Sequence, residues 1–232
     1  MEDFWVNHDG VRLHCLINKA SNELLPIIFV PGMLGQAGQY KTEMETFAER
    51  PSLAMSLRGR GQSDVPASGY TFDDHITDIE AVVDACGWDR FYLSGFSASV
   101  VLVVGYTLRY PEKVAGLILG DSIPVYKQIS PDWVDRMIEF HPEHDGRLLQ
   151  ALQADSAKVV LWEQSKDIQC PVLLMKGGVE GSMLSTKNLD KYRELLAEVE
   201  VVIFPEAGHE LWKPTPDLYL QTVGDFLSKG FR

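Results

Sequence analysis

Residues 91–99 read Phe-Tyr-Leu-Ser-Gly-Phe-Ser-Ala-Ser, and this stretch decides the fold. Its apolar start, 91–93, predicts a short buried strand, and the apolar residues 100–108 that follow predict a helix. The Gly-x-Ser-x-Ser pattern between them, centred on Ser97, predicts a sharp turn. At such a strand–turn–helix junction the central hydroxyl emerges at the carboxyl end of the strand, and N–H groups of the helix face whatever it attacks. The stretch therefore predicts an α/β fold with an accessible Ser97.

The pattern departs from a G-x-S-x-G nucleophile elbow at one position, because Ser99 stands where the second glycine belongs. Serine is the next-smallest polar choice, so we expect a slightly shifted turn that keeps its function. The alternative is that Ser97 is merely the N-cap of the following helix, a common role for serine.

The rest of the chain alternates between predicted strands and helices. Short continuous apolar runs at 27–30, 115–119 and 171–175 are typical of strands buried on both faces of a parallel sheet. The alternation around Asp9-Gly10 predicts an opening hairpin of two edge strands. Residues 71–86 carry apolar side chains at helical spacing, with an N-cap threonine before them and a glycine after them. This order predicts a three-layer α/β sandwich.

Two further motifs carry a resemblance to a known family. Residues 58–64 read Arg-Gly-Arg-Gly-Gln-Ser-Asp after a buried strand, and residues 207–209 read Ala-Gly-His after the last one. With the turn at Ser97, they make the chain resemble the α/β-hydrolase superfamily from about residue 5 to residue 228. The resemblance implies a single domain over 1–232 with a mostly parallel sheet of about eight strands.

The family resemblance also implies a small helical lid over the active site at about 122–168, where the strand–helix rhythm breaks. Its candidates to line a pocket, or simply to pack the lid onto the body, are the larger apolar side chains Tyr126, Trp133, Met137, Phe140 and Trp162.

A serine hydroxyl needs a base within hydrogen-bond reach before it becomes a useful nucleophile. The chain has six histidines, and His209 follows a strand near the C-terminus, so by resemblance it is the base for Ser97. His8, His14 and His75 precede the serine, and we expect them at the surface.

Two residues compete to be the acid that orients His209. By resemblance the acid comes three residues after the glycine that ends the 171–175 strand, and counting from Gly177 leads to Glu180. We expect nearby glycines to give this loop the freedom that a glutamate needs. The alternative is Asp121, which directly follows the 115–119 strand, where certain relatives keep their acid. We favour Glu180.

The resemblance also assigns two N–H groups to an oxyanion hole. They belong to Met33, just after Pro31-Gly32, and to Ala98, just after the serine. In the glycine-rich loop, Arg58 and Arg60 have two interpretations: we expect them to brace the loop, and the alternative is that they bind an anion.

The amino-acid composition and net charge limit the kinds of binding partner that we expect. The formal net charge of −12 argues against binding to nucleic acid or to an anionic membrane surface. The three cysteines, Cys15, Cys86 and Cys170, are far apart and lack C-x-x-C spacing, so we expect reduced thiols and a cytoplasmic protein. The start of the chain lacks the pattern of a signal peptide. We expect no cofactor or metal, and a monomer or homodimer.

These features predict a serine hydrolase that acts on a small carboxylic ester, thioester or lactone through an acyl-enzyme, with a small soluble acyl compound as its partner. Serine at position 97 argues against haloalkane dehalogenases and epoxide hydrolases, which would need aspartate there. One alternative is a C–C bond hydrolase or lyase of an aromatic or menaquinone-type pathway with the same triad. Another is a non-catalytic ligand-binding protein on the same fold.

Overall fold

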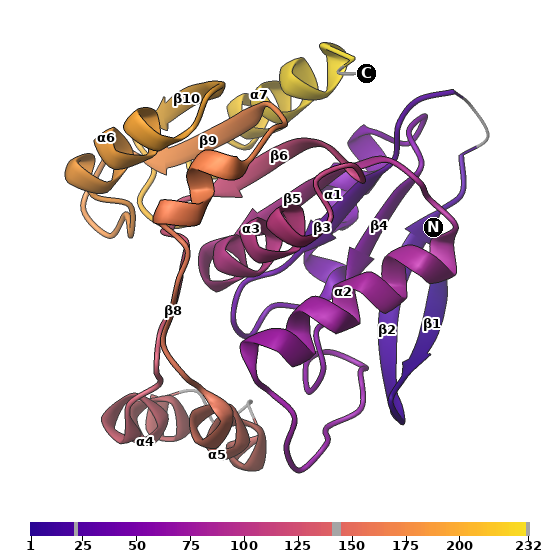
Figure 1. Cartoon of the computed structure of the whole chain (residues 1–232), viewed down its shortest axis with the longest axis vertical. Coiled ribbons are helices and arrows are strands. Elements are labelled where there is room, and N and C mark those ends of the chain that lie inside the picture. Colours follow the sequence, from indigo (N-terminus) through magenta and orange to yellow (C-terminus); the bar gives the residue numbers. More distant parts are fainter. Residues whose placement is uncertain (21–22, 141–144, 231–232) are drawn as a thin grey trace.

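The computed structural model describes residues 1–20, 23–140 and 145–230, and its centre is a sheet of eight strands. These strands are β1 (Glu2–His8), β2 (Val11–Asn18), β3 (Ile27–Val30), β4 (Ser52–Met55), β5 (Phe91–Phe96), β6 (Val114–Gly120), β9 (Val172–Gly177) and β10 (Val199–Phe204). Their order across the sheet is β1-β2-β4-β3-β5-β6-β9-β10 (Figure 1). β2 runs antiparallel to both of its neighbours, and the other neighbouring pairs are parallel. The predicted, mostly parallel sheet is confirmed.

The expected opening hairpin forms, but only one of its strands lies at an edge. β1 pairs with β2 alone, whereas β2 also pairs with β4 from Cys15 to Asn18. The prediction of two edge strands was therefore wrong for β2.

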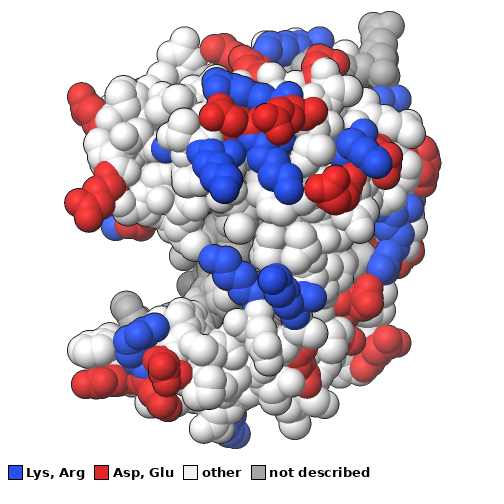
Figure 2. All heavy atoms as spheres, turned by 60° about the vertical axis from the view of Figure 1, so that its left-hand side comes forward, with Lys and Arg blue, Asp and Glu red and all other residues white. Residues whose placement is uncertain are grey.

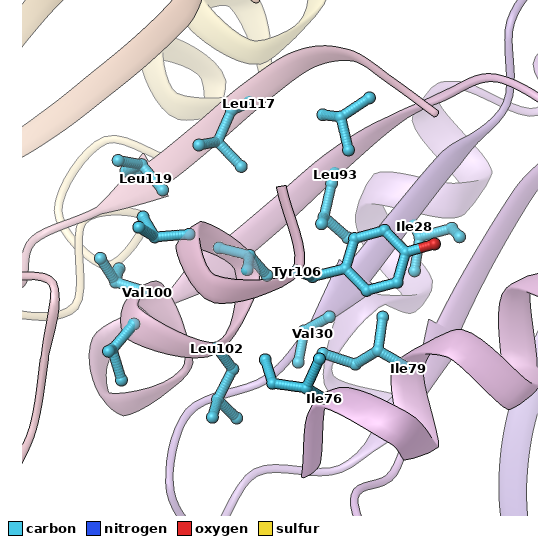
Figure 3. Packing of buried hydrophobic residues seen from close by; sticks show 14 of the residues in the cluster. Ile28, Val30, Ile76, Ile79, Leu93, Val100, Leu102, Tyr106, Leu117 and Leu119 are labelled. Carbon is cyan, nitrogen blue, oxygen red and sulfur yellow. The ribbon is translucent and has the colours of Figure 1, made fainter. Parts of the chain in front are cut away.

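Helices cover both faces of the sheet. They are α1 (Lys41–Thr46) and α7 (Pro216–Ser228) on one face, and α2 (Phe72–Cys86), α3 (Val100–Arg109) and α6 (Thr186–Leu195) on the other. Successive side chains of a strand point to opposite faces. Phe29 accordingly packs in the cluster of α1 and α7, and Val30 in the cluster of α2 and α3. Figure 3 shows Val30 and Leu93 gathered with Ile76 and Leu102 of these helices. This is the predicted three-layer sandwich.

The predicted helix after residue 70 is α2, and its ends follow the local sequence. The Thr71 side chain accepts a hydrogen bond from the Asp74 backbone N–H, while the Asp74 carboxylate accepts one from the Thr71 backbone N–H. Gly87 ends the helix with φ 66°, a left-handed conformation that suits glycine.

The segment between β6 and β9 leaves the body of the molecule and returns to it. It contains β7 (Val125–Tyr126), α4 (Pro131–Phe140), α5 (Gly146–Asp155) and β8 (Val159–Val160). β7 and β8 pair antiparallel, and Figure 1 shows α4 and α5 beyond them, away from the sheet. We call this segment, residues 122–168, the lid; its residues 141–144 lie outside the described part of the chain.

A small apolar core joins the lid to the body. Val134 of α4 and Leu149 of α5 pack with Tyr70, which belongs to the loop before α2. The Asp155 carboxylate accepts hydrogen bonds from the backbone N–H groups of Gly69 and Tyr70, at 2.6 and 2.9 Å. The lid is therefore anchored at α5, where it lies against the loop that precedes α2.

Two findings on the described residues bear on partners. No helix there has the length and the apolar character that a membrane crossing requires. In the same residues no group of three or more His, Cys, Asp or Glu side chains is arranged to hold a metal ion.

Cys15, Cys86 and Cys170 are free thiols, and burial raises the pKa of Cys86 and of Cys170 to about 12, which leaves these two thiols unreactive at neutral pH.

Candidate active site

The sharp turn after β5 has the geometry that its sequence predicts. Ser97 adopts φ 58°, a left-handed conformation that is uncommon for a residue with a side chain. Residues in such strained conformations are often found at functional sites. Gly95 is required by packing, since a Cβ there would lie 2.5 Å from Cγ2 of Val103 and 3.0 Å from the carbonyl oxygen of Ser99. The glycine therefore lets α3 approach β5 closely.

Ser99, the departure from the motif, holds the turn together. Its hydroxyl is buried and accepts a hydrogen bond from the backbone N–H of Phe96 at 2.9 Å. The hydroxyl oxygen also lies 2.8 Å from the carbonyl of Val30 and 2.9 Å from the carbonyl of Phe96, to one of which it donates. The serine thus links the turn to the end of β3, which a glycine could not do.

Ser97 and His209 lie within hydrogen-bond distance, as predicted. His209 follows β10, and its Nε2 lies 2.8 Å from the Ser97 hydroxyl oxygen. The imidazole packs against the Phe96 ring with 4.7 Å between ring centroids, and a quarter of the side chain remains exposed. The Ser97 hydroxyl therefore points toward the histidine, which does not fit the alternative of a simple helix cap.

Asp121 holds the other side of the histidine ring. Its side chain is fully buried directly after β6, and its Oδ2 lies 2.9 Å from Nδ1 of His209. The same carboxylate accepts hydrogen bonds from the Gly177 N–H, the Ser182 hydroxyl and the Met183 N–H, at 3.1, 2.6 and 2.8 Å. Like Ser97, Asp121 has a positive φ, 45°.

These contacts determine the charge state of the site. Burial alone would raise the pKa of Asp121, but hydrogen bonds from His209, Ser182, Met183 and Gly177 outweigh it and lower the pKa below its usual value. The carboxylate is therefore ionised at neutral pH. Nδ1 of His209 donates to it, which leaves Nε2 as the acceptor for the Ser97 hydroxyl.

The prediction that Glu180 orients the histidine is wrong. Its side chain is exposed, and in the described structure Nδ1 of His209 donates its hydrogen bond to the Asp121 carboxylate. The loop after β9 reaches the solvent at Glu180 and then returns, so that Ser182 and Met183 contact Asp121 instead. The alternative position at the end of β6 is the one that the structure supports.

We expected the glycines near Glu180 to give the loop conformational freedom, but two of them instead allow a close approach between two backbone segments. A Cβ on Gly177 would lie 2.0 Å from the carbonyl oxygen of Gly208, and one on Gly178 would lie 2.7 Å from Cα of Pro205. The loop after β9 and the loop that carries His209 therefore touch along their backbones. Only Gly181, at φ 97°, needs the conformational freedom of glycine.

The predicted oxyanion-hole residues lie beside the serine. Met33 and Ala98 line, together with Ser97 and Gly32, a cavity of about 250 Å³. A Cβ on Gly32 would lie 3.2 Å from Cβ of Ser97, so the end of β3 and the turn after β5 are in close contact.

This cavity is enclosed by the lid and is mostly apolar. Its lid residues include Tyr126 and Trp133 of the five side chains suggested by sequence. Of the others, Met137 packs in the lid core, Trp162 packs against Tyr192, and Phe140 is exposed. Figure 2 shows the surface hollowed between the lid, at the bottom of the view, and the body of the molecule.

A second, wider groove of about 1010 Å³ also borders the serine. It is lined by His209 and by aromatic side chains that include Phe96, Trp212 and Tyr219. Ser97 lines both spaces, and among the described residues His209 lines only the wider one. The site is therefore two-sided, with the histidine on the open side.

Two of the histidines expected at the surface are buried. His75 is 1% exposed and His14 is 4% exposed. His75 lies in the wall of the smaller cavity, where burial first, and the positive charge of Arg60 second, lower its pKa to about 3. Chain order alone gave no signal of this, because α2 packs its buried face against the sheet.

Comparison with known proteins agrees with the fold described above. A family model described as alpha/beta hydrolase fold matches residues 26–157. The chain is 20% identical to a putative 2-succinyl-6-hydroxy-2,4-cyclohexadiene-1-carboxylate synthase of Bacillus subtilis, covering 95% of this chain and 96% of that protein. It is 21% identical to carboxylesterase YbfK of the same organism, covering 100% of this chain and 89% of the relative.

Among solved structures, an esterase from Exiguobacterium antarcticum superposes with a TM-score of 0.83 at 19% identity, covering 97% of this chain and 98% of that one. At this identity the likeness shows a shared fold. The family model spans more than half of the 232 residues, and the chain therefore belongs to the alpha/beta hydrolase fold family.

Proposed function

We propose that this protein is a serine hydrolase that cleaves a small carboxylic ester, thioester or lactone through an acyl-enzyme. The observation that carries the proposal is the continuous contact from Ser97 through His209 to Asp121, at 2.8 and 2.9 Å. Nucleophile, base and orienting acid within hydrogen-bond reach are the arrangement that activates a serine. Similarity to a carboxylesterase and an esterase supports the reaction class.

In the first step the Ser97 oxygen attacks the acyl carbonyl carbon while its proton moves to Nε2 of His209. The ionised Asp121 stabilises the resulting imidazolium and keeps the ring in place. The carbonyl oxygen becomes an oxyanion, and we assign its donors to the N–H groups of Met33 and Ala98, two residues that line the cavity together with Ser97. Each such donor is typically worth about 10²–10³ in rate.

The two-sided site orients the substrate. His209 must protonate the leaving group, so the leaving group lies in the wider groove that the histidine lines. The acyl group then occupies the smaller cavity under the lid, whose volume of about 250 Å³ limits it to a short chain. Water enters from the groove, gives a proton to His209 and attacks the acyl carbon. The bond between this carbon and the Ser97 oxygen then breaks as His209 returns the proton to that oxygen, and the acid leaves.

A second candidate reaction is C–C bond cleavage or elimination with the same serine and histidine. It is favoured by the similarity to a putative 2-succinyl-6-hydroxy-2,4-cyclohexadiene-1-carboxylate synthase. Turnover of a β-diketone or cyclohexadiene-type compound, where simple esters fail, would select this reaction over ester hydrolysis.

The first test is intact mass after incubation with a fluorophosphonate, which reports an activated serine whatever the natural substrate is. We expect one adduct on the wild type and none on Ser97→Ala or His209→Ala. Ser68→Ala is the matched control, because Ser68 is exposed and lies outside both cavities, and it should label like the wild type. A well-folded wild type without adduct would contradict the proposal and favour a non-catalytic binding protein.

A further inference from the structure

Arg60 is a buried cation in the wall of the cavity that holds Ser97. Its side chain comes from the glycine-rich loop after β4, is 4% exposed, and lines the smaller cavity under the lid. Burial lowers the pKa of Arg60 to about 10, which still leaves the guanidinium charged at neutral pH.

The hydrogen bonds of Arg60 use only part of its guanidinium. Nε donates to the carbonyl of Met33 at 2.8 Å, and Nη1 donates to the carbonyl of Arg58 at 2.6 Å. Nη1 also lies 3.2 Å from Nε2 of His75. His75 is neutral and its Nδ1 donates to the carbonyl of Thr71, so Nε2 is free to accept. Three of the five N–H groups are thereby satisfied.

The two N–H groups of Nη2 have no partner in the described part of the chain. Nη2 of Arg60 is also not among the fully buried atoms of the described residues that lack a hydrogen-bond partner. Those atoms belong to His14, Ser52 and Tyr106. Because Arg60 lines the cavity and its Nη2 is neither hydrogen-bonded nor fully enclosed among the described residues, we infer that Nη2 is accessible from this space.

The neighbouring arginine, Arg58, differs from Arg60 because its Nε, Nη1 and Nη2 atoms all donate hydrogen bonds. Nε and Nη2 of Arg58 both donate to the Asp78 carboxylate at 2.6 Å, and Nη1 donates to the carbonyl of Gly69. No carboxylate among the described residues pairs with Arg60 in this way. The Tyr70 ring centroid lies 5.9 Å from Cζ of Arg60, but no carboxylate among the described residues is hydrogen-bonded to this buried charge, and an anionic ligand would offset the cost of burying it.

A second cation lies at the same cavity. Lys127, from the lid just after β7, is exposed and also lines it. Figure 2 shows basic side chains bordering the hollow between lid and body. The positive charge at this cavity is opposite in sign to the formal net charge of the chain, −12, so the overall composition does not explain it.

We propose that Arg60 binds a carboxylate at the far end of the acyl group, with Lys127 at the cavity mouth, so that the preferred substrates are monoesters or monothioesters of short dicarboxylic acids. This inference rests on the proposed function, which places the acyl group in that cavity. The apolar wall then contacts the methylene chain between the two carboxyl groups.

The kinetic test compares two esters with one leaving group, 4-nitrophenyl hydrogen glutarate and 4-nitrophenyl valerate, which differ in a terminal carboxylate and a terminal methyl. We expect Arg60→Gln to lower the ratio of their kcat/KM values by about 10- to 100-fold, the range for a hydrogen bond between charged groups. Lys127→Gln should lower the ratio by about 2- to 5-fold, since an exposed cation is screened by water.

Arg60→Lys and Arg50→Gln are the control variants. Arg60→Lys keeps the charge and should restore part of the ratio. Arg50 is also a buried arginine, but it donates to the carbonyls of Leu25 and Leu227, away from both cavities, so Arg50→Gln should keep the wild-type ratio. The ratio cancels any general loss caused by moving Met33, which Arg60 also contacts. An unchanged ratio in Arg60→Gln would overturn the proposal.

A binding measurement separates this inference from the proposed function. Calorimetry on Ser97→Ala, with monomethyl glutarate and methyl valerate, needs no turnover. Tighter binding of monomethyl glutarate that is lost in Ser97→Ala/Arg60→Gln supports the carboxylate site, even if fluorophosphonate labelling fails. Equal binding of both compounds overturns the site, even if labelling succeeds.

Discussion

Two loops at the carboxyl edge of the sheet each carry an acidic residue close to the loop of His209. The acidic side chain is buried and hydrogen-bonded in one loop and exposed to solvent in the other. After β6, Asp121 is fully buried and accepts four hydrogen bonds, one of them from His209. After β9, the Glu180 side chain is exposed, and the backbone carbonyl oxygen of Glu180 lies 3.0 Å from where a Cβ on Gly208 would be.

The difference shows that the loop after β9 contributes donors to the site and no acid. Ser182 and Met183 both donate to the Asp121 carboxylate, as does Gly177 at the end of β9. A carboxylate can stay ionised in a buried position only when such donors compensate for lost water. Four experiments on these two loops test whether Asp121, and not Glu180, is the acid that orients His209.

The largest effect is expected from Asp121→Asn. Each carboxylate oxygen accepts two hydrogen bonds, and an asparagine amide would put an NH₂ group against two donors. The histidine would lose its orienting partner, and kcat/KM for 4-nitrophenyl acetate should fall by about 10³–10⁴. A circular-dichroism spectrum like that of the wild type would show that the fold is kept. A loss below tenfold would remove Asp121 from the mechanism.

Ser182→Ala should have an intermediate effect, because it removes one of the donors to Asp121. The free energy of unfolding should fall by about 1–3 kcal/mol, the range for losing a hydrogen bond to a buried charged group. Activity should fall less than in Asp121→Asn, since His209 keeps its partner. Urea unfolding at neutral pH measures the first effect; unchanged stability would mean that the 2.6 Å contact contributes nothing.

The pH dependence of stability should distinguish Asp121 from an ordinary surface acid. Its folded-state pKa lies below the usual 3.8, so its ionised form stabilises the fold. That contribution is complete above the unfolded-state pKa and is lost as the pH falls through the lower folded-state pKa. The gap in unfolding free energy between wild type and Asp121→Asn should therefore narrow below about pH 4. A gap that stays constant there would contradict the lowered pKa.

The smallest effect is expected from Glu180→Gln. The side chain is exposed, so activity should change by less than about twofold and stability by less than about 0.5 kcal/mol. The same ester assay and urea titration apply. A tenfold loss of activity would show that the loop after β9 rearranges to bring Glu180 to His209 during the reaction.

Much of this arrangement could be predicted because it depends on short stretches of chain. The run at 91–99 specifies strand, turn and helix by its own residues and so indicates Ser97, and His209 follows from the resemblance of its Ala-Gly-His motif to the family. The acid could not be predicted in this way. β6 and β9 are parallel neighbours that end at the same edge of the sheet, and spacing along the chain does not tell which of their loops reaches the histidine.

The amino-acid sequence alone predicts the α/β alternation and the turn at Ser97, because hydrophobic periodicity and turn residues act locally, whereas His209 is assigned by the resemblance of its Ala-Gly-His motif to the family. Tertiary packing makes Asp121 the buried partner of His209, and it leaves Nη2 of Arg60 without a hydrogen-bond partner among the described residues. Both outcomes depend on which donors and acceptors from distant segments meet in a space without water, and that is settled when the sheet, helices and lid pack together.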